Sequence, residues 1–173
     1  MCKKLGLVSA IMGLALAVRA GSAADEQEKK DPPKVELTDD EKAIVELTNK
    51  ERANKDLPPL KPNPVLTKVA RGHSANMAKA KQVDHILADG KTPGTRAKDG
   101  GYRFEVCGEN VGWGAWTAKQ KWTVTDMMDW WMKSKDHREN ILHKEFTEIG
   151  VGIQIGDDGK RYFTQLFAAP FVE

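Results

Sequence analysis

The sequence predicts an α+β domain in which helices pack in layers against a small antiparallel sheet. Apolar residues recur at helical spacing in several segments before residue 135. Two runs rich in β-branched and aromatic residues flank a cluster of turn residues near the C-terminus. Helices and strands do not alternate along the chain, as they would around a parallel sheet.

Residues 1–24 have the pattern of a cleaved signal peptide. Two lysines precede an uncharged apolar stretch at 5–18, and the small residues at 22–24 suit a signal peptidase. This stretch is too short to span a bilayer comfortably, and no later stretch is long enough. Cys2 precedes the apolar run, whereas a lipoprotein signal needs a cysteine at its end. We therefore expect a secreted or periplasmic protein without a transmembrane segment.

Cleavage would change the charge of the chain. The formal net charge of +2 includes three bases in the signal, Lys3, Lys4 and Arg19, and the signal holds no acid, so the mature chain would carry −1. A near-neutral chain without a basic stripe lacks the field that attracts phosphate backbones, and we expect no nucleic-acid partner. Cys107 would be the only remaining cysteine, so we expect a small buried side chain and a fold stabilised by its core.

Residues 25–37 are charged and contain two prolines, so we expect a short flexible tether before one domain at 38–173. The first helix is predicted at 39–55, because Thr38 and Glu41 match a capping box. The two prolines that follow would end this helix.

A second helix is predicted at 64–81, where Asn63 supplies an N-cap and a proline takes the first helical position. Segment 88–102 is polar and glycine-rich without a sustained period, so we expect mostly a loop, with at most a helical turn, that frames a cleft. Residues 104–111 are predicted as a short strand, and the glycines around it suggest turns or close backbone approach.

A third helix is predicted from Val124 to near Ser134, with Thr123 as its N-cap and apolar residues at i, i+3, i+4 and i+7. The β-rich runs at 148–155 and 162–168 flank a Gly-Asp-Asp-Gly turn cluster. These runs predict an antiparallel hairpin.

Five motifs follow one another in a characteristic order. They are Met77 with Val83-Asp84-His85, Gly108-Glu109-Asn110, Trp131-Met-Lys-Ser134 with His137-Arg138-Glu-Asn140-Ile141-Leu142, Phe146-Thr-Glu-Ile-Gly-Val-Gly152, and Tyr162-Phe-Thr-Gln165. In order and spacing they resemble the bacterial branch of the CAP (SCP-type) superfamily, over about residues 41–169. This superfamily includes cysteine-rich secretory proteins, venom allergens and plant pathogenesis-related proteins. The resemblance implies a three-layer α-β-α sandwich and a cleft with two histidines and two acids.

Carried over residue by residue, the resemblance implies that His85 and His137 are the two histidines of that cleft and that Glu109 is its first acid. The fourth position departs from the pattern, because this chain has Ser134 where animal and plant members have a glutamate. Asn110 would line the same cleft or position neighbouring backbone. In some members this constellation is associated with a divalent metal, zinc in particular.

Two imidazoles and a carboxylate are a sensible ligand set for Zn²⁺, and they leave one position for water or substrate, as in catalytic zinc sites. Such a metal would lower the pKa of bound water to about 7. The alternative is a metal-free, hydrogen-bonded polar cleft in which His85, Glu109 and His137 make binding sensitive to pH. Both alternatives remain open at the level of sequence.

Other histidines are expected to have structural roles. His73 falls on the apolar face of the second helix and predicts a hydrogen-bonded core histidine, whereas His143 predicts a surface residue. Ser134 and His137 stand three residues apart, but no third group or oxyanion donor is evident, which argues against a serine hydrolase.

The tryptophans are expected mainly in the core, and Trp116 or Trp122 is the preferred choice for a binding platform. They lie close together in the sequence, at Trp113, Trp116, Trp122, Trp130 and Trp131. Arg138 and Asn140 are expected to tie the segment after the third helix to neighbouring backbone.

Three functions are compatible with these observations. The favoured one is a secreted, non-catalytic binding module whose cleft engages a small molecule, a lipid, a cell-wall component or a peptide, with metal optional. The second is a metal-dependent, protease-like hydrolase with Glu109 as ligand or general base, although the motif HExxH is absent. The third is a structural envelope protein.

Overall fold

The computed structural model describes residues 35–171. The predicted signal at 1–24 and the predicted tether up to residue 34 lie outside the described residues. Within them the elements are α1 (Asp39–Ala53), β1 (Lys61–Pro62), α2 (Pro64–Ala80), α3 (Pro93–Asp99), β2 (Phe104–Ala115), α4 (Val124–Lys133), α5 (Lys135–Ile141), β3 (Glu148–Ile155) and β4 (Lys160–Pro170). No helix in this range is long and apolar enough to cross a membrane.

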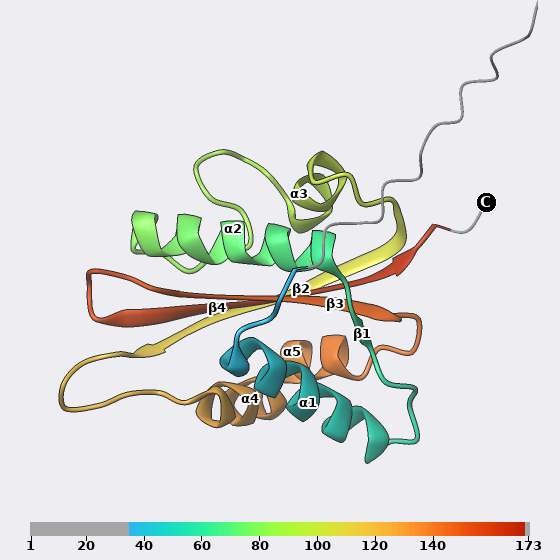
Figure 1. The fold of residues 1–173 in the computed structure, drawn as a ribbon, viewed down its shortest axis with the longest axis horizontal. Coiled ribbons are helices and arrows are strands. Elements are labelled where there is room, and N and C mark those ends of the chain that lie inside the picture. Colours follow the sequence, from blue (N-terminus) through green and yellow to red (C-terminus); the bar gives the residue numbers. More distant parts are fainter. Residues whose placement is uncertain (1–34, 172–173) are drawn as a thin grey trace, which may run out of the picture. The chain divides into compact units, whose positions relative to one another are not determined.

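The elements form three layers, with the sheet between two groups of helices (Figure 1). The strand order is β1-β3-β4-β2; α2 and α3 cover one face, and α1, α4 and α5 cover the other. The predicted α+β sandwich and its C-terminal antiparallel hairpin are confirmed. One addition is β1, which pairs in parallel with β3 and makes the sheet mixed. A two-residue strand is too short to leave an alternating pattern in the sequence.

The two long helices begin at the predicted caps. Thr38 Oγ1 accepts from the Glu41 main-chain N–H at 3.3 Å, and Glu41 Oε2 accepts from Thr38 N–H at 2.8 Å. Asn63 Oδ1 accepts from the main-chain N–H groups of Val65 and Leu66 at the start of α2. Helix α2 ends where Lys81 adopts a left-handed conformation with φ of 55°. Capping therefore fixes where these helices start.

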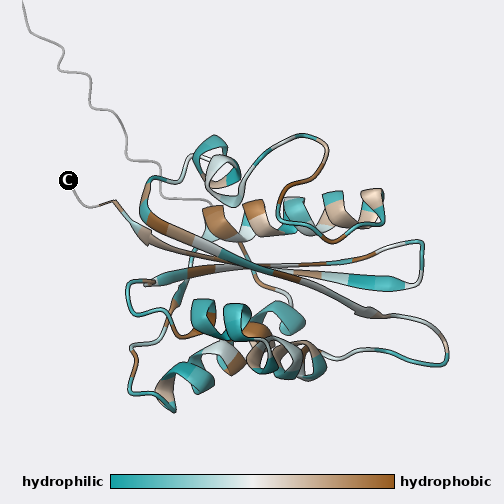
Figure 2. Cartoon of the chain, turned by 180° about the vertical axis from the view of Figure 1, so that it is seen from behind, coloured by the Kyte–Doolittle hydropathy of each residue, from teal (hydrophilic) through white to brown (hydrophobic). Residues whose placement is uncertain are grey.

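Helix α2 lies unusually close to the sheet because β3 presents glycines to it. A Cβ atom on Gly150 would lie 2.1 Å from the main-chain carbon of Leu66, and one on Gly152 would lie 2.3 Å from that of Ala70. Ser74 Oγ also donates to the Gly152 carbonyl at 2.9 Å. The Gly-Val-Gly stretch of β3 therefore sets the distance between the two layers. Figure 2 shows hydrophobic residues on the strands and on the helix turns next to the sheet.

A buried arginine connects α1 to the segment after α5. Arg52 is fully buried, and its guanidinium donates to four main-chain carbonyls at 2.9–3.2 Å, those of Pro58, Ile141, His143 and Phe146. Burial lowers the pKa of Arg52 from its usual value. These bonds fix the end of α5, the helix that carries one of the candidate histidines.

Two short helices were not predicted. Segment 88–102 contains α3, where Thr92 Oγ1 caps the Thr95 N–H at 3.1 Å and a proline takes the first helical position. The segment after the third predicted helix forms α5, which follows Ser134 directly. Each spans only seven residues, or about two turns, so neither shows a sustained period.

Strand β2 continues to Ala115, four residues beyond its predicted end at 111. The glycines that suggested turns lie inside the strand and leave room for tryptophans. A Cβ atom on Gly114 would lie 2.4 Å from Trp122 Cβ, and one on Gly112 would lie 3.2 Å from Trp130 Cζ3.

Candidate functional site

The candidate site residues lie at an open edge of the sheet. Strand β2 pairs only with β4, so its other side is an edge within the described residues. Side chains from the helices satisfy part of this edge, because Asn140 Nδ2 donates to the Glu109 carbonyl at 3.1 Å and Trp131 Nε1 donates to the Val111 carbonyl at 3.3 Å. The loop after α2 and helix α5 therefore meet around this edge and bring candidate residues from distant parts of the chain together.

Glu109 is the centre of the site and its side chain is almost completely buried. Its Oε1 accepts a hydrogen bond from His85 Nδ1 at 2.9 Å, and its Oε2 accepts one from Arg96 Nη2 at 2.6 Å. His73 Nε2 lies 3.8 Å from Oε1. The guanidinium stabilises the carboxylate charge where water is excluded, and both carboxylate oxygens are engaged.

Arg96 also holds the loop that carries His85. Its Nη1 donates to the carbonyls of His85 and Lys91, at 2.9 and 2.7 Å. This residue belongs to α3, in the segment that was expected to be mostly loop, and no sequence pattern indicated its role. The signal that could have located α3 was Thr92-Pro93, which repeats the N-cap-then-proline pattern of α2.

The tautomer of His85 follows from its partner. A carboxylate only accepts, so Nδ1 carries the proton, and in the neutral ring Nε2 carries the lone pair. The hydrogen bond to Glu109 raises the pKa of His85 above its usual value. The side chain is 49% exposed, and no group among residues 35–171 bonds its Nε2. His85 therefore has one oriented ring nitrogen left for a ligand.

His73 lies beneath this pair. It is buried, and its Nε2 lies 2.9 Å from the Asp84 carbonyl, so Nε2 is the donor. Burial lowers the pKa of His73, which favours the neutral ring. The predicted hydrogen-bonded core histidine is confirmed, and its proximity to Glu109 is a feature that the sequence did not indicate.

His137 reaches the cleft from α5. Its ring centroid lies 5.0 Å from that of Trp130, and its Nδ1 is buried without a hydrogen-bond partner in the described part of the chain. Burial lowers the pKa of His137, and the positive charge of His85 lowers it further. Asn110 Nδ2 donates to the His137 carbonyl at 3.0 Å, and Asn140 Nδ2 donates to Asn110 Oδ1 at 2.9 Å.

The predicted site residues thus take different positions. His85 and Glu109 are bonded directly, whereas the ring of His137 contacts Trp130. Asn110 holds the main chain of His137 from the other face of the sheet. Ser134 joins α4 to α5 without a side-chain capping bond, and no hydrogen bond links it to His137 within residues 35–171. In the same range no three His, Cys, Asp or Glu side chains form a group that could hold a metal ion.

Cys107 lies on the neighbouring part of β2 and is half-buried. It packs against the core cluster that contains Leu66, Tyr102 and Leu166, but it is only partly buried, whereas a buried side chain was expected. Burial raises its pKa to about 11, so the protonated thiol dominates at neutral pH. Such a cysteine is a poor nucleophile.

An aromatic groove of about 450 Å³ is lined in part by Trp130, whose ring contacts His137. Its lining residues are Val83, Gly112, Trp113, Gly114, Ala115, Gln120, Trp122 and Trp130. The expected core position is confirmed for Trp131, whereas Trp113 and Trp130 are 48% and 43% exposed. Trp116 is half-buried, and Arg161 covers its ring with its guanidinium 4.8 Å from the centroid.

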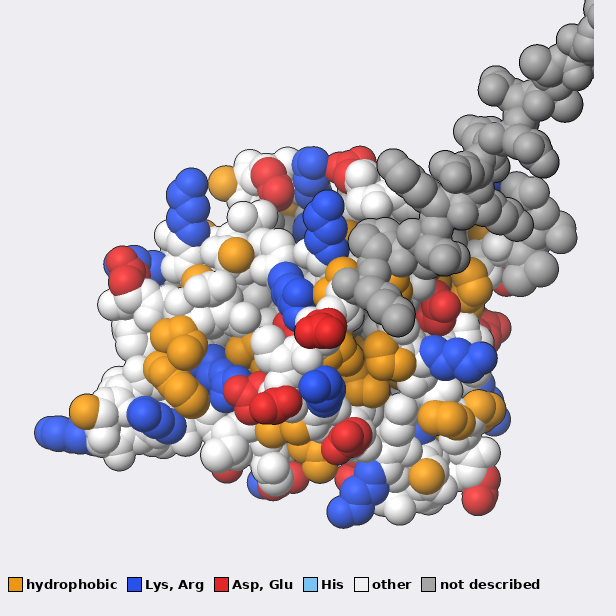
Figure 3. Space-filling model, in the orientation of Figure 1, with side chains coloured by type: hydrophobic (Ala, Val, Ile, Leu, Met, Phe, Trp, Pro, Cys, Tyr) orange, Lys and Arg blue, Asp and Glu red, His pale blue; other side chains and the backbone are white. Residues whose placement is uncertain are grey.

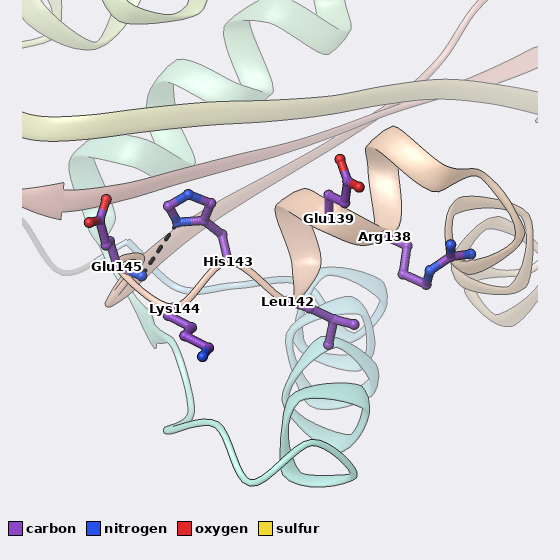
Figure 4. Close-up of a pocket in the computed structure, with 6 residues that line it drawn as sticks. All are labelled: Arg138, Glu139, Leu142, His143, Lys144 and Glu145. Atoms are coloured by element: carbon purple, nitrogen blue, oxygen red, sulfur yellow. Dashed lines mark hydrogen bonds between the residues drawn. The ribbon is translucent and has the colours of Figure 1, made fainter.

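A second hollow of about 530 Å³ lies beyond α5, and Figure 4 shows its side chains spreading in different directions. His143 is exposed, as predicted, and its Nδ1 accepts from the Glu145 main-chain N–H at 3.4 Å. Arg138 Nη1 donates to the Met132 carbonyl at 2.9 Å, which confirms its expected tie to backbone. This hollow lacks the converging polar groups of the cleft.

The layered fold and the histidines at the edge of β2 define a CAP domain. The family model of the cysteine-rich secretory protein family (CAP) matches residues 45–167, and the chain belongs to this family. Among curated proteins, the uncharacterized protein YkwD of Bacillus subtilis (strain 168) is 38% identical over 112 residues, which are 65% of this chain and 41% of YkwD. The chain therefore spans less than half the length of this relative.

Solved structures show the same fold. An outer surface protein from Borrelia burgdorferi has a TM-score of 0.70 and 21% identity, over 80% of this chain and 98% of that chain. An extracellular protein containing a SCP domain, from Bacillus anthracis str. Ames, has a TM-score of 0.64 and 29% identity, over 78% of this chain and 45% of that one.

Proposed function

We propose that this chain is a secreted recognition module whose cleft at the edge of β2 binds a ligand through His85 and His137. The observation that carries the proposal is the hydrogen bond from His85 Nδ1 to Glu109, whose carboxylate is itself held by Arg96. A buried ion pair here fixes the orientation of a half-exposed imidazole. Such preorganisation lowers the entropy that a ligand must overcome on binding.

A divalent metal ion, zinc in the first instance, is the ligand that fits two imidazoles. His85 would contribute Nε2 and His137 a ring nitrogen. Glu109 would act through His85 rather than on the metal, because its oxygens are already bonded to His85 and Arg96. Ligating histidines commonly donate their second N–H to a carboxylate in this way. With two protein ligands, a bound zinc ion would supply further positions for donor atoms of a second molecule.

A metal-dependent hydrolase is less well supported. Catalytic zinc sites use three protein ligands, and hydrolysis also needs a general base within reach. Glu109 is committed to an ion pair, and Ser134 supplies no carboxylate. A purely structural envelope role would not explain why the His85 ring is held in one orientation.

Export from the cytoplasm is part of the proposal. The signal pattern at 1–24 supports it, as does the relative from Bacillus anthracis, which is described as an extracellular protein.

Calorimetric titration of Zn²⁺ into the metal-free protein tests the metal part of this proposal. We expect one-to-one binding at micromolar or lower dissociation constant, lost in the His85→Ala/His137→Ala double variant. His143→Ala is the matched control, because this exposed histidine lies in the other hollow, and it should bind as the unchanged protein does. An absence of binding in a folded protein, or unchanged binding by the double variant, would contradict the metal site.

A further inference from the structure

Three polar side chains are fully buried between the sheet and the layer of α1, α4 and α5. Asn110 lies on β2, Gln165 on β4 and Thr48 on α1, and each residue is 0% exposed. Charged side chains, by contrast, spread over the surface with both signs intermixed, as Figure 3 shows for one face. A buried polar group lowers stability unless it is hydrogen-bonded, so the partners of these side chains indicate what they do.

The three side chains form one continuous polar network. Thr48 Oγ1 donates to the Ile44 carbonyl of α1 at 2.7 Å and accepts from Gln165 Nε2 at 2.8 Å. Gln165 Oε1 accepts from Asn110 Nδ2 at 3.1 Å. The same Asn110 nitrogen donates to the His137 carbonyl at 3.0 Å. The polar network therefore runs from α1 through β4 and β2 and ends on the main chain of a candidate histidine.

The donors and acceptors of the polar network fix the direction of its bonds. A hydroxyl carries one hydrogen, and that of Thr48 goes to the helix carbonyl, a stronger acceptor than Met128 Sδ at 3.8 Å. Thr48 therefore accepts from the Gln165 nitrogen, which directs Gln165 Oε1 toward Asn110. Because this oxygen only accepts, Asn110 must present its NH2 group, whose second hydrogen is left for the His137 carbonyl.

Helix α5 depends on bonds from other elements. It spans seven residues, and Ser134 makes no side-chain capping bond at its start. A helix this short is unstable by itself. Arg52 holds main-chain carbonyls at and just beyond the end of α5, and Asn140 Nδ2 donates to Asn110 Oδ1 at 2.9 Å. The bond from the Asn110 amide supports the first half of the helix, where His137 lies.

We propose that Gln165 and Thr48 are positioning residues for His137. They orient the Asn110 amide, which holds the main chain of His137 and so sets the direction in which its imidazole leaves α5. An apolar side chain at position 165 would fill the same space, but the Asn110 NH2 group would lose a partner and could turn away from the carbonyl. This inference rests on the proposed function, because a ligand that binds the His137 ring gives the ring's placement its importance.

The His85 ring has a separate support on the other face of the sheet, where Arg96 and Glu109 fix it. Glu109 and Asn110 are neighbours on β2, and successive residues of a strand direct their side chains to opposite faces. Substitutions in the polar network should therefore affect His137 and leave His85 unchanged. The signals of the His85 ring provide an internal reference for the experiment.

NMR of the metal-free protein and calorimetric zinc titration together test the assignment. Gln165→Met removes the amide with little change in volume, and Thr48→Val replaces the hydroxyl by a methyl group. We expect both substitutions to shift the carbonyl carbon and ring proton signals of His137, and to raise the zinc dissociation constant roughly tenfold, as loss of a residue behind a metal ligand commonly does. Thr48→Ser keeps the hydroxyl and should restore both properties.

Thr67→Val is the matched control, because Thr67 is a buried threonine of α2, on the opposite side of the sheet. It should leave the His137 signals and zinc affinity unchanged. The assignment would be overturned by unchanged His137 signals in a folded Gln165→Met or Thr48→Val protein, or by a Thr48→Ser protein that behaves as Thr48→Val does. Failure of the unchanged protein to bind zinc would contradict the metal site alone, since the His137 signals report its positioning without metal.

Discussion

His85 Nδ1 donates to Glu109 Oε1 at 2.9 Å, and this bond joins a half-exposed imidazole to a carboxylate that is 1% exposed. The buried partner is fixed in turn by Arg96, whose guanidinium also bonds the backbone of the His85 loop. The orientation of His85 therefore depends on α3, the helix that carries Arg96. This dependence makes Arg96 a positioning residue with a measurable role.

Replacement of Arg96 should destabilise the protein strongly. Arg96→Ala would leave the Glu109 carboxylate buried without its cation, and loss of one partner of a buried pair costs roughly 3–5 kcal/mol. Urea unfolding measures the change. Lys91→Ala is the control, because its exposed ion pair with Asp99 should contribute about 1 kcal/mol or less. Equal, small effects of both substitutions would show that the buried pair is not important for stability.

Two glycine-to-alanine substitutions should have opposite effects. Gly150→Ala places a methyl group 2.1 Å from the main chain of α2, so the helix must move away from the sheet, and we expect a loss of more than about 3 kcal/mol. Gly72→Ala, inside α2, meets nothing within 4 Å and should stabilise the helix by roughly 0.5–1 kcal/mol. Thermal unfolding of both variants is the measurement, and a tolerated Gly150→Ala would contradict the close layer packing.

Even a conservative replacement of the buried Arg52 should lower the stability of the protein. Arg52→Lys keeps the charge but cannot reach the four carbonyls that the guanidinium bonds, so some acceptors would stay unsatisfied in the interior. We expect a loss of at least about 2 kcal/mol in denaturant unfolding. Arg71→Lys is the comparison at a partly exposed guanidinium, because Arg71 is 36% exposed and bonds the buried carboxylate of Glu41, and we expect a smaller loss there. If Arg52→Lys left the free energy of unfolding unchanged, the four carbonyls would have to find other donors, which would contradict this account.

Acidification should weaken the fold partly through His73. Burial lowers its pKa, while Glu109 raises it and Arg96 lowers it. As the pH falls below about 6.5, the unfolded chain takes up this proton before the folded chain does, so stability declines. His85 acts in the opposite sense because its pKa is raised. His73→Gln should flatten the fall in melting temperature between about pH 7 and pH 5, whereas an unchanged slope would assign the acid sensitivity to other groups.

The sequence predicted the parts of the fold that have strong local signals. Helices α1 and α2 could be placed because Thr38 and Asn63 cap them and long apolar stripes follow. Helices α3 and α5 could not, because two turns leave no period. The glycines within β2 were expected to form turns, but in the structure they leave room for large side chains such as Trp122. A sequence pattern does not show which side chain will pack against a glycine.

Prediction of the site had a different basis. His85, Glu109 and His137 were selected by resemblance, because spacing alone cannot bring a loop, a strand and a later helix together. Arg96 was missed since an arginine in a polar segment looks solvated until its buried acceptors are known. The exposure of Trp113 was missed for a related reason: its place on an edge strand depends on the sheet order, which the sequence does not specify.

The most direct test of the account is the proton NMR spectrum of the imidazole rings during zinc titration of the metal-free protein at about pH 7. If His85 and His137 bind the metal as proposed, their ring signals shift together and saturate at one zinc ion per chain, while the signals of buried His73 and exposed His143 stay nearly unchanged. Zinc-induced shifts at His143 alone, or no shift at His85 and His137, would contradict the proposal that these two imidazoles form the binding cleft.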